Sequence, residues 1–308
     1  MTAQIAFTNV LMTLFYIIPG YALCKFKKAS ADHLSTLSSI LIYFCAPCMV
    51  LNNFLSLEFS FGKLIDMGIF FVVTFILQAL FMLAIFLLFK KRFHESKYRM
   101  LSLASVMGNV GFFGLPIVKA LLPHSPEAWC YSSVYLLSMN VLVFTVGVYC
   151  LTGKKESMTI KAAIINPTIL ALLFSLPLYI FGVGNYVPSL ISKALTLLSD
   201  MTTPLCMMIL GMRLAKTPIK TLFCRPFVYG ICFCKLLLYP LFCWALTCFL
   251  PVSDAFKSAL LILSATPCAS IILNMAEMYR SETENAANCV MLSTLLCFMT
   301  IPVMTMLI

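Results

Sequence analysis

Apolar stretches long enough to cross a membrane follow one another along the whole chain, separated by short polar segments. A transmembrane helix needs about 20 mostly apolar residues. Strict alternation of apolar and polar residues is absent, and an open strand in hydrocarbon would leave its backbone groups unpaired, so these stretches are predicted to be helices. The predicted spans lie at 4–24, 34–53, 64–89, 100–121, 128–151, 164–183, 188–212, 222–250, 256–277 and 284–307. The predicted fold is an all-α polytopic membrane protein with ten transmembrane helices.

The amino-acid composition agrees with a membrane protein. Of the 308 residues, 62% are hydrophobic and 10% are charged, whereas a soluble domain has about 45–50% apolar and about 25% charged residues. The spans leave almost no sequence for a soluble domain. The 14 cysteines are scattered through apolar runs, where a thiol behaves as a small hydrophobe. They therefore predict neither a disulfide framework nor a redox site.

The basic residues predict the orientation in the membrane. Most of the 21 lysine and arginine residues fall in the loops after odd-numbered spans, which the positive-inside rule assigns to the cytoplasm. The loops after even-numbered spans hold only Lys63, Lys119, Lys193 and Lys257. We therefore expect a multi-pass protein of the plasma (inner) membrane with both termini extracytoplasmic. The net charge of +10 reflects this topology, so the expected partner is the lipid bilayer and not nucleic acid.

Intramembrane prolines indicate an internal repeat. Three pairs recur at similar offsets: Pro19 with Pro177, Pro47 with Pro204, and Pro116 with Pro267. They predict two five-helix repeats, 1–156 and 157–308, and an odd number of spans per repeat inverts the second one. Inverted repeats with interrupted helices are typical of secondary transporters, whose substrate site lies near the breaks at the bilayer midplane. The alternative is that prolines are simply frequent in membrane helices.

The fourth span contains the strongest local signal for a binding site. Met107–Pro116 holds three glycines, a proline and Asn109, which predicts an interrupted helix. Its counterpart, Ser264–Ser270, is rich in small and hydroxyl residues. Two half-helices meeting there would direct their positive N-terminal ends at a shared cavity suited to an anion. The alternative is that the small residues only pack helices together. The candidate substrate-binding residues are Gly108, Asn109, Gly111, Gly114, Pro116, Thr266, Pro267, Ser270 and Asn274.

Four segments carry a family resemblance. These are Asn109–Pro116, Asp200–Gly211, Pro267–Tyr279 and the tripeptide 165–167. Asn109–Pro116 is similar to the fourth-helix crossover of one family, and Asp200–Gly211 is similar to its seventh-helix acid before Leu-Gly. Pro267–Tyr279 is similar to its ninth-helix crossover proline, and 165–167 is similar to the start of its sixth helix. Over essentially its whole length the chain resembles the auxin efflux carrier family, the bacterial relatives of the plant PIN auxin carriers.

The resemblance implies a fold and an activity. In that family helices 1, 2, 6 and 7 form a scaffold, and helices 3–5 and 8–10 form a mobile core whose broken helices 4 and 9 cross at their prolines. The implied activity is elevator-type transport of small organic anions, such as auxins, malate or malonate. Homodimers through the scaffold helices are known in the plant branch. Unlike the plant carriers, this chain has a short central loop. After Pro47 it has apolar residues, whereas the plant carriers have a serine there.

Ionisable residues at membrane depth are functional candidates because their insertion is costly. Asp200, with Thr203 nearby, is a candidate for binding a proton or sodium ion as a buried carboxylate, or else a structural acid beside Pro204. Lys235 is expected to extend toward the membrane interface. Glu277 is expected to form an interfacial ion pair with Arg280.

Signatures of enzymes and of ATP-driven pumps are missing from the sequence. All three histidines lie in loops, and no Walker loop, dinucleotide fingerprint or nucleophile elbow is present. No cofactor, metal site or enzymatic activity is therefore expected. The predicted function is secondary transport of small organic anions. The alternative is a sodium or proton antiporter or symporter of the same architecture that uses Asp200.

Overall fold

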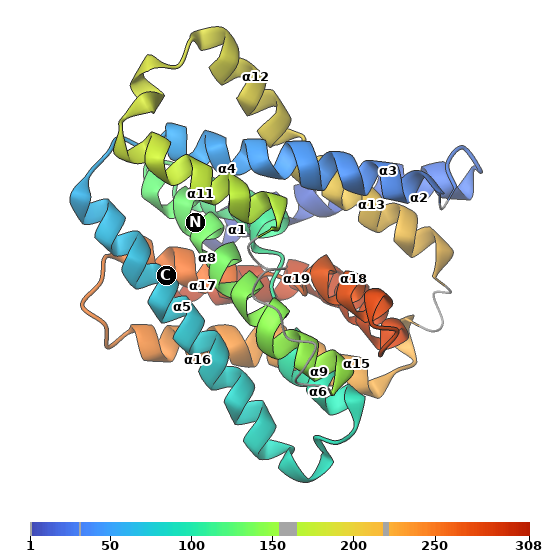
Figure 1. The fold of residues 1–308 in the computed structure, drawn as a ribbon. Helices are drawn as coiled ribbons and strands as arrows, with labels where there is room; N and C mark the ends of the chain where they lie inside the picture. Colours follow the sequence, from blue (N-terminus) through green and yellow to red (C-terminus); the bar gives the residue numbers. More distant parts are fainter. Residues whose placement is uncertain (1, 31, 154–164, 218–221) are drawn as a thin grey trace.

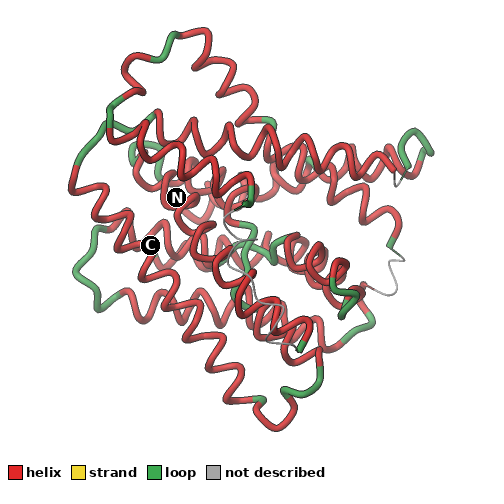
Figure 2. Tube along the Cα trace, in the orientation of Figure 1, coloured by secondary structure: helices red, strands yellow, loops and turns green. Residues whose placement is uncertain are grey.

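The computed structural model describes residues 2–30, 32–153, 165–217 and 222–308, and almost all of these are helical (Figures 1 and 2). The α-helices are α1 (Thr2–Phe15), α2 (Ile17–Lys25), α3 (Asp32–Ile40), α4 (Ala46–Leu55), α5 (Phe61–Leu88), α6 (Ser96–Ala104), α7 (Leu115–Leu121), α8 (Pro126–Leu142), α9 (Val148–Thr152), α11 (Pro167–Ile180), α12 (Ser189–Asp200), α13 (Thr202–Lys216), α15 (Pro226–Phe233), α16 (Tyr239–Thr247), α17 (Asp254–Ser264), α18 (Ser270–Met278) and α19 (Thr283–Met304). Four short π-helices, η1 (Leu41–Cys45), η3 (Val110–Gly114), η4 (Val143–Gly147) and η7 (Cys234–Leu238), lie within the predicted spans.

Within the described residues, 7 helices are long and apolar enough to cross a membrane. They are Thr2–Lys25, His33–Leu55, Phe61–Leu88, Pro126–Thr152, Ser189–Lys216, Pro226–Thr247 and Thr283–Leu307. Two shorter apolar helices, Val110–Leu121 and Pro167–Ile180, fall in the fourth and sixth predicted spans. The ninth is divided between α17 and α18. The helical, multi-span architecture agrees with the sequence prediction, and the count of ten spans stays a prediction.

Helix α5 shows why the fold needs a lipid environment. It is the most apolar of these helices, with a mean hydropathy of 2.7. One of its faces nevertheless stays uncovered by the protein and exposes a stripe of large apolar side chains at helical spacing. The stripe consists of Ile65, Ile69, Val72, Ile76, Leu80, Leu83 and Leu87. In water such a continuous apolar surface would be strongly unfavourable, whereas in a bilayer it contacts lipid.

Prolines interrupt the first and seventh predicted spans. A proline inside a helix cannot donate its backbone hydrogen bond, and its ring clashes with the carbonyl of the residue four positions earlier. Pro19 lies four residues after Phe15, where α1 ends, and Pro204 lies four residues after Asp200, where α12 ends. The sequence therefore sets both bends locally.

Two pairs of helices pack closely in the upper half of Figure 1. In one pair α2 lies against α13, and in the other α4 lies against α11. The first pair approaches closely because a Cβ on Gly20 would overlap the backbone of Met208, and one on Gly211 would overlap the backbone of Ile17. Helices α5, α6, α9, α15 and α16 lie in the lower half of the same view. At the chain ends, α1 packs against α19.

The fourth and ninth predicted spans are broken at 105–109 and 265–269, in the middle of the molecule (Figure 2). Gly108 and Cys268 occupy the same position in the two breaks. Pro267 lies inside its break, whereas Pro116 lies in the first turn of α7. The two prolines paired in the sequence therefore do not occupy matching places. The expected repeat boundary after residue 156 lies outside the described residues.

Candidate functional site

The two broken spans cross each other through their backbones. The N–H of Asn109 donates to the carbonyl of Pro267 (2.8 Å), and the N–H of Ala269 donates to the carbonyl of Met107 (3.1 Å). Gly108 and Cys268 thereby form an antiparallel bridge. Backbone groups freed by interrupting a helix must find partners inside a membrane protein. Each break supplies the partners of the other.

Local sequence explains why the chain breaks and crosses here. Thr266 precedes Pro267, and a residue before proline is disfavoured in helical conformation. Gly108 lets the two backbones meet, because a Cβ there would overlap Thr266 Oγ1 and lie 3.1 Å from Lys235 Nζ. Gly114 plays a similar role one turn later, since a Cβ would lie 2.8 Å from Thr266 Cγ2.

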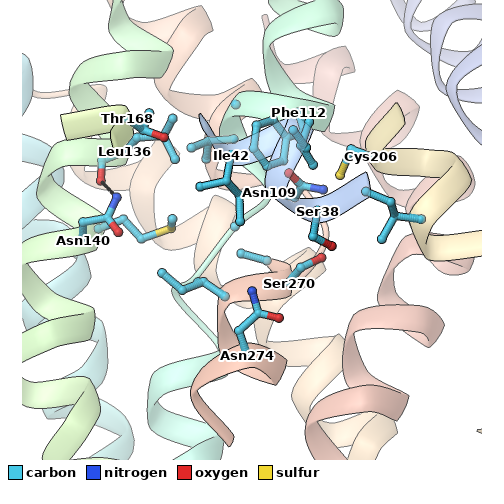
Figure 3. A pocket seen from close by; sticks show the side chains of 18 of the residues that line it. Ser38, Ile42, Asn109, Phe112, Leu136, Asn140, Thr168, Cys206, Ser270 and Asn274 are labelled. Carbon is cyan, nitrogen blue, oxygen red and sulfur yellow. Dashed lines mark hydrogen bonds between the residues drawn. The ribbon is translucent and has the colours of Figure 1, made fainter. Parts of the chain in front are cut away.

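A cavity of about 180 Å³ opens beside the crossing (Figure 3). Its wall is formed by five groups of residues: α3 and η1, the break in span four with the start of η3, α8, the start of α11 at Asn166 and Thr168, and α13 with the start of α18. Its apolar lining includes Leu41, Ile42, Val110, Phe112, Leu136, Met139, Ile209, Leu210 and Ile271. Two of the π-helices, η1 and η3, contribute to this lining, and short π-helical segments are frequent at functional sites. We call this space the first cavity.

Polar side chains form a row across the first cavity. Asn109, Ser38, Ser270 and Asn274 follow one another down the view in Figure 3, although they come from three different spans. Asn140 faces the cavity from α8 and donates to the carbonyl of Leu136 (2.8 Å), while its buried Oδ1 has no hydrogen-bond partner among the described residues. These amides and hydroxyls offer a ligand both donors and acceptors.

The electrostatics of the first cavity favour an anion. Helix α18 and the segment Val110–Leu121 both begin at the cavity wall, and the first N–H groups of a helix have no partner within it. Arg213 lines the cavity from α13 and donates to Asn274 Oδ1 (3.3 Å). Among the described lining residues none carries a carboxylate. Helix N-termini and a guanidinium are both suited to binding a carboxylate.

Lys235 adds a buried positive charge behind the crossing. Its side chain is 0% exposed, so the expectation that it reaches the membrane interface is wrong. Its ammonium donates to the carbonyl of Ser264 (2.6 Å) at the C-terminal end of α17, and lies 5.0 Å from the centre of the Tyr239 ring. The negative end of a helix dipole and an aromatic face both stabilise a cation. No ion pair of the described residues includes Lys235.

The candidate substrate-binding residues separate into two groups. Gly108, Asn109, Gly111, Ser270 and Asn274 line the first cavity. Gly114, Thr266 and Pro267 lie at the crossing but outside its lining. The Thr266 hydroxyl is buried and donates to the carbonyl of Leu263 (2.7 Å).

Pro116 and the candidate ion-coupling residues Asp200 and Thr203 lie in a second cavity, also of about 180 Å³. The expectation of a buried Asp200 is wrong, because its side chain is exposed at the end of α12. Lys119 lines the same cavity, with its ammonium 5.3 Å from the centre of the Trp129 ring. We call this space the second cavity.

The expected ion pair of Glu277 with Arg280 is not formed. Both side chains are exposed, and the ion pairs of the described residues join Lys97 with Glu95 and Arg225 with Glu284 instead. The pair does not form because the helix ends between the two residues. Helix α18 ends at Met278, and Arg280 beyond it adopts a positive φ of 50°. The two residues therefore do not share a helical face.

Sequence reasoning missed several lining residues, and the two cations are the most important. Because each lies at the end of an apolar stretch, where basic residues usually mark topology, the sequence predicts loop positions for Arg213 and Lys119. Both instead lie within helices and face a cavity. Cys206 was grouped with the apolar cysteines, yet it lines the first cavity close to Asn109 (Figure 3). Lys119 and Cys206 each lie three residues after a candidate residue, Pro116 and Thr203, and this spacing was the available signal. No such signal marks Arg213.

Comparison with known proteins identifies the family of this chain. Residues 5–305 match the membrane transport protein family. The chain belongs to this family, that of the auxin efflux carriers. The transporter is also 26% identical over 291 residues to an uncharacterized transporter of Methanocaldococcus jannaschii, a match that covers 92% of this chain and 93% of that protein. The family resemblance found in the sequence is confirmed, and the transporter is not an enzyme.

Replacing Lys235 by methionine tests whether its charge acts on the first cavity. We expect the transporter to fold, because removing a buried charge offsets the loss of a donor to the Ser264 carbonyl. We expect affinity for an organic anion to fall about tenfold, the equivalent of about 1.4 kcal/mol of lost attraction. The measurement is ligand-induced thermal shift, with Lys257→Met as the control outside both cavities. Unchanged affinity in Lys235→Met would show that this ammonium only stabilises the end of α17.

Proposed function

We propose that the protein is a secondary transporter of small organic anions, namely mono- or dicarboxylates. The observation that carries this proposal is the first cavity. It combines two half-helix N-termini and Arg213 with an apolar wall, and its described lining holds no carboxylate. Such a site would bind the charged end of an acid at the crossing and cover its carbon skeleton with side chains such as Leu136 and Ile209.

The transport mechanism that we propose is elevator-type alternating access by a ten-span fold of two inverted repeats. Two features support the repeat: the breaks at 105–109 and 265–269 match in form, and the contact of α4 with α11 has a counterpart in that of α13 with α2. Helices 1, 2, 6 and 7 would stay in place as the scaffold. Helices 3–5 and 8–10 would carry the crossing and its substrate from one face to the other.

The proposed orientation places both termini on the extracytoplasmic side of the plasma membrane. Basic residues after odd-numbered spans favour it. The end of α13, with Arg213 and Lys216, then lies toward the cytoplasm, and the first cavity opens on that side. A homodimer through the scaffold helices completes the proposal.

The proposed function is tested with purified transporter and a panel of acids: malonate, malate and indole-3-acetate. Thermal shift with and without sodium, at two pH values, measures binding, because a ligand stabilises the state that it binds. Uptake of the same radiolabelled acids into proteoliposomes measures transport. We expect at least one acid to raise the unfolding midpoint and to be taken up. No binding and no uptake of any of the three acids would contradict the proposed function.

Asn109→Ala tests the polar contact closest to the crossing. The variant keeps the backbone bond to Pro267, so we expect normal expression and an unchanged unfolding midpoint. Loss of one amide contact should weaken substrate affinity by about 5- to 30-fold, equivalent to about 1–2 kcal/mol. The measurement is the KM for uptake of the acid found in the panel. A wild-type KM would remove the Asn109 side chain from the site.

The second candidate function is coupling to sodium or protons at Asp200. The Asp200 carboxylate shares the second cavity with the hydroxyl residues Thr203 and Ser199, and oxygen ligands of this kind suit a hard cation. Asp200→Asn would then abolish sodium or proton flux, measured with a pH-sensitive dye in proteoliposomes. Organic anion uptake that survives in this variant without any ion gradient would contradict this function.

A further inference from the structure

The two cavities lie one beyond the other along the same three spans. Span two lines the first cavity with residues of 38–42 and the second with Met49. Span four lines the first cavity with 108–112 and the second with residues of 115–119. Span seven lines the first cavity with residues of 206–213 and the second with residues of 199–204. In each span the second-cavity residues are displaced along the helix by one to two turns. The cavities are therefore stacked along the direction in which a substrate crosses.

A tightly packed layer separates the two cavities. Between the lining stretches lie Cys45 of span two, Phe113 of span four and Leu205 of span seven, which are 0%, 0% and 9% exposed. Gly111 belongs to the same layer, since a Cβ there would lie 3.0 Å from Leu136 Cδ1 and 3.3 Å from Met49 Cε. A closed, apolar barrier between two cavities is the arrangement that alternating access requires.

The charges of the second cavity differ from those of the first. It contains both an ammonium, Lys119 on α7, and a carboxylate, Asp200 at the end of α12. No ion pair of the described residues joins the two, so each charge still faces the cavity. Two opposite charges sharing so small a space attract each other. A cation bound at Asp200 would meet the repulsion of Lys119, whereas an anion bound at Lys119 would compete with Asp200.

The two charges belong to different parts of the fold. Lys119 lies on α7, whose span carries Asn109 at its other end and which packs against α1, α8 and α17. Asp200 belongs to the helix that packs against α4 and continues into α13. A relative movement of these two parts, as proposed above for transport, would change the distance between the charges.

We propose that the second cavity is the extracytoplasmic vestibule of the same pathway, in which Lys119 binds the carboxylate of the substrate and Asp200 neutralises Lys119 when the vestibule is empty. This proposal rests on the proposed function and extends it to a second anion site. Asp200 here is a competitor for Lys119 and not a cation ligand. The arriving acid neutralises the ammonium in place of the attraction that Asp200 exerts across the cavity, and this weakens the attraction between the two parts of the fold.

Opposite effects of two variants test the competition. The assay is uptake of radiolabelled malonate, malate and indole-3-acetate by right-side-out membrane vesicles, which present the extracytoplasmic face, and by inside-out vesicles. In right-side-out vesicles we expect Lys119→Met to raise the KM at least tenfold and Asp200→Asn to lower it. In inside-out vesicles we expect a smaller change, because the first cavity is met first. Lys193→Met and Asp66→Asn are matched controls, since both side chains are exposed and neither lines the first or the second cavity.

The outcomes separate this proposal from the proposed function. If wild-type vesicles take up none of the acids, both are overturned. If wild-type uptake is normal and Lys119→Met shifts the KM equally from both faces, or Lys119→Met and Asp200→Asn shift it in the same direction, only the role of the second cavity is overturned. Loss of sodium- or proton-driven uptake in Asp200→Asn, with a normal KM in Lys119→Met, would replace the anion site by a cation site.

A charge exchange tests the attraction without any substrate. Lys119→Asp places two carboxylates in the second cavity, and Asp200→Lys places two ammonium groups there. We expect each single reversal to lower the unfolding midpoint of the purified transporter, and the double variant Lys119→Asp/Asp200→Lys to recover most of the loss. Additive losses in the double variant would show that the two charges do not interact, and would overturn the proposal.

Discussion

Arg213→Gln is expected to weaken the binding of organic acids more than any other side-chain change in the first cavity that leaves the crossing intact. Arg213 supplies the one charged side chain among the described lining residues. A hydrogen bond to a charged group contributes about 1.5–3 kcal/mol, so its loss should weaken affinity by about 10- to 100-fold. The measurement is the KM for uptake of the acid found in the panel, together with its thermal shift. Glutamine keeps a donor toward Asn274 and so separates the loss of charge from the loss of a contact.

Two further variants make the Arg213 result specific. Lys216→Gln removes a charge from the same end of α13, but its side chain is exposed and does not line the cavity, so a near-normal KM is expected. Arg213→Lys keeps the charge without the planar guanidinium and should lie between glutamine and wild type, because a carboxylate binds arginine through two parallel hydrogen bonds. Equal KM values for Arg213→Gln and Lys216→Gln would contradict a direct role of Arg213.

The crossing could be predicted from the sequence because its causes are local. Three glycines in 108–114, and Pro267 after Thr266, all disfavour continuous helix. The same is true of the bends at Phe15 and Asp200, which follow from prolines four residues later. These features depend on residues close in the chain, so a single sequence contains the information needed.

The positions of the cations could not be predicted in this way. A lysine in an apolar run extends to the interface or stays buried depending on what surrounds it. Lys235 stays buried because two partners stabilise its ammonium inside the protein. One is a carbonyl at the end of α17, which is distant in sequence, and the other is the Tyr239 ring, which directly follows η7. Arg213 and Lys119 face cavities only because other spans surround them there. Such tertiary partners leave no trace in hydropathy or charge spacing.

The site and the fold depend on the same few atoms. Asn109 binds Pro267 with its backbone N–H and directs its side chain into the first cavity. Gly108 lines that cavity on one side and faces Lys235 on the other. A change to the backbone contact at the crossing should therefore alter folding and transport together, whereas truncating the Asn109 side chain or removing the Arg213 charge should alter transport alone. This distinction can be measured.

Gly108→Ala is the second change for which a large effect is expected. The new Cβ would overlap Thr266 Oγ1 and lie 3.1 Å from Lys235 Nζ, so the antiparallel bridge with Cys268 must open or shift. Overpacking of a tightly packed interior costs about 1–3 kcal/mol. We expect a lower unfolding midpoint and severely reduced uptake. Gly230→Ala is the matched control, because nothing lies within 4 Å of a Cβ at that helical position, and alanine favours helix.

A second substitution shows whether the overlap itself is the cause. Thr266→Ala removes the Oγ1 atom that a Cβ on Gly108 would meet, so Gly108→Ala/Thr266→Ala should regain part of the lost midpoint and uptake. Thr266→Val leaves a methyl group at that place, and Gly108→Ala/Thr266→Val should regain nothing. If both double variants behave alike, then the glycine is needed for a reason other than the close approach of the two breaks. Rescue by alanine alone would tie the transport function to the contact between spans four and nine.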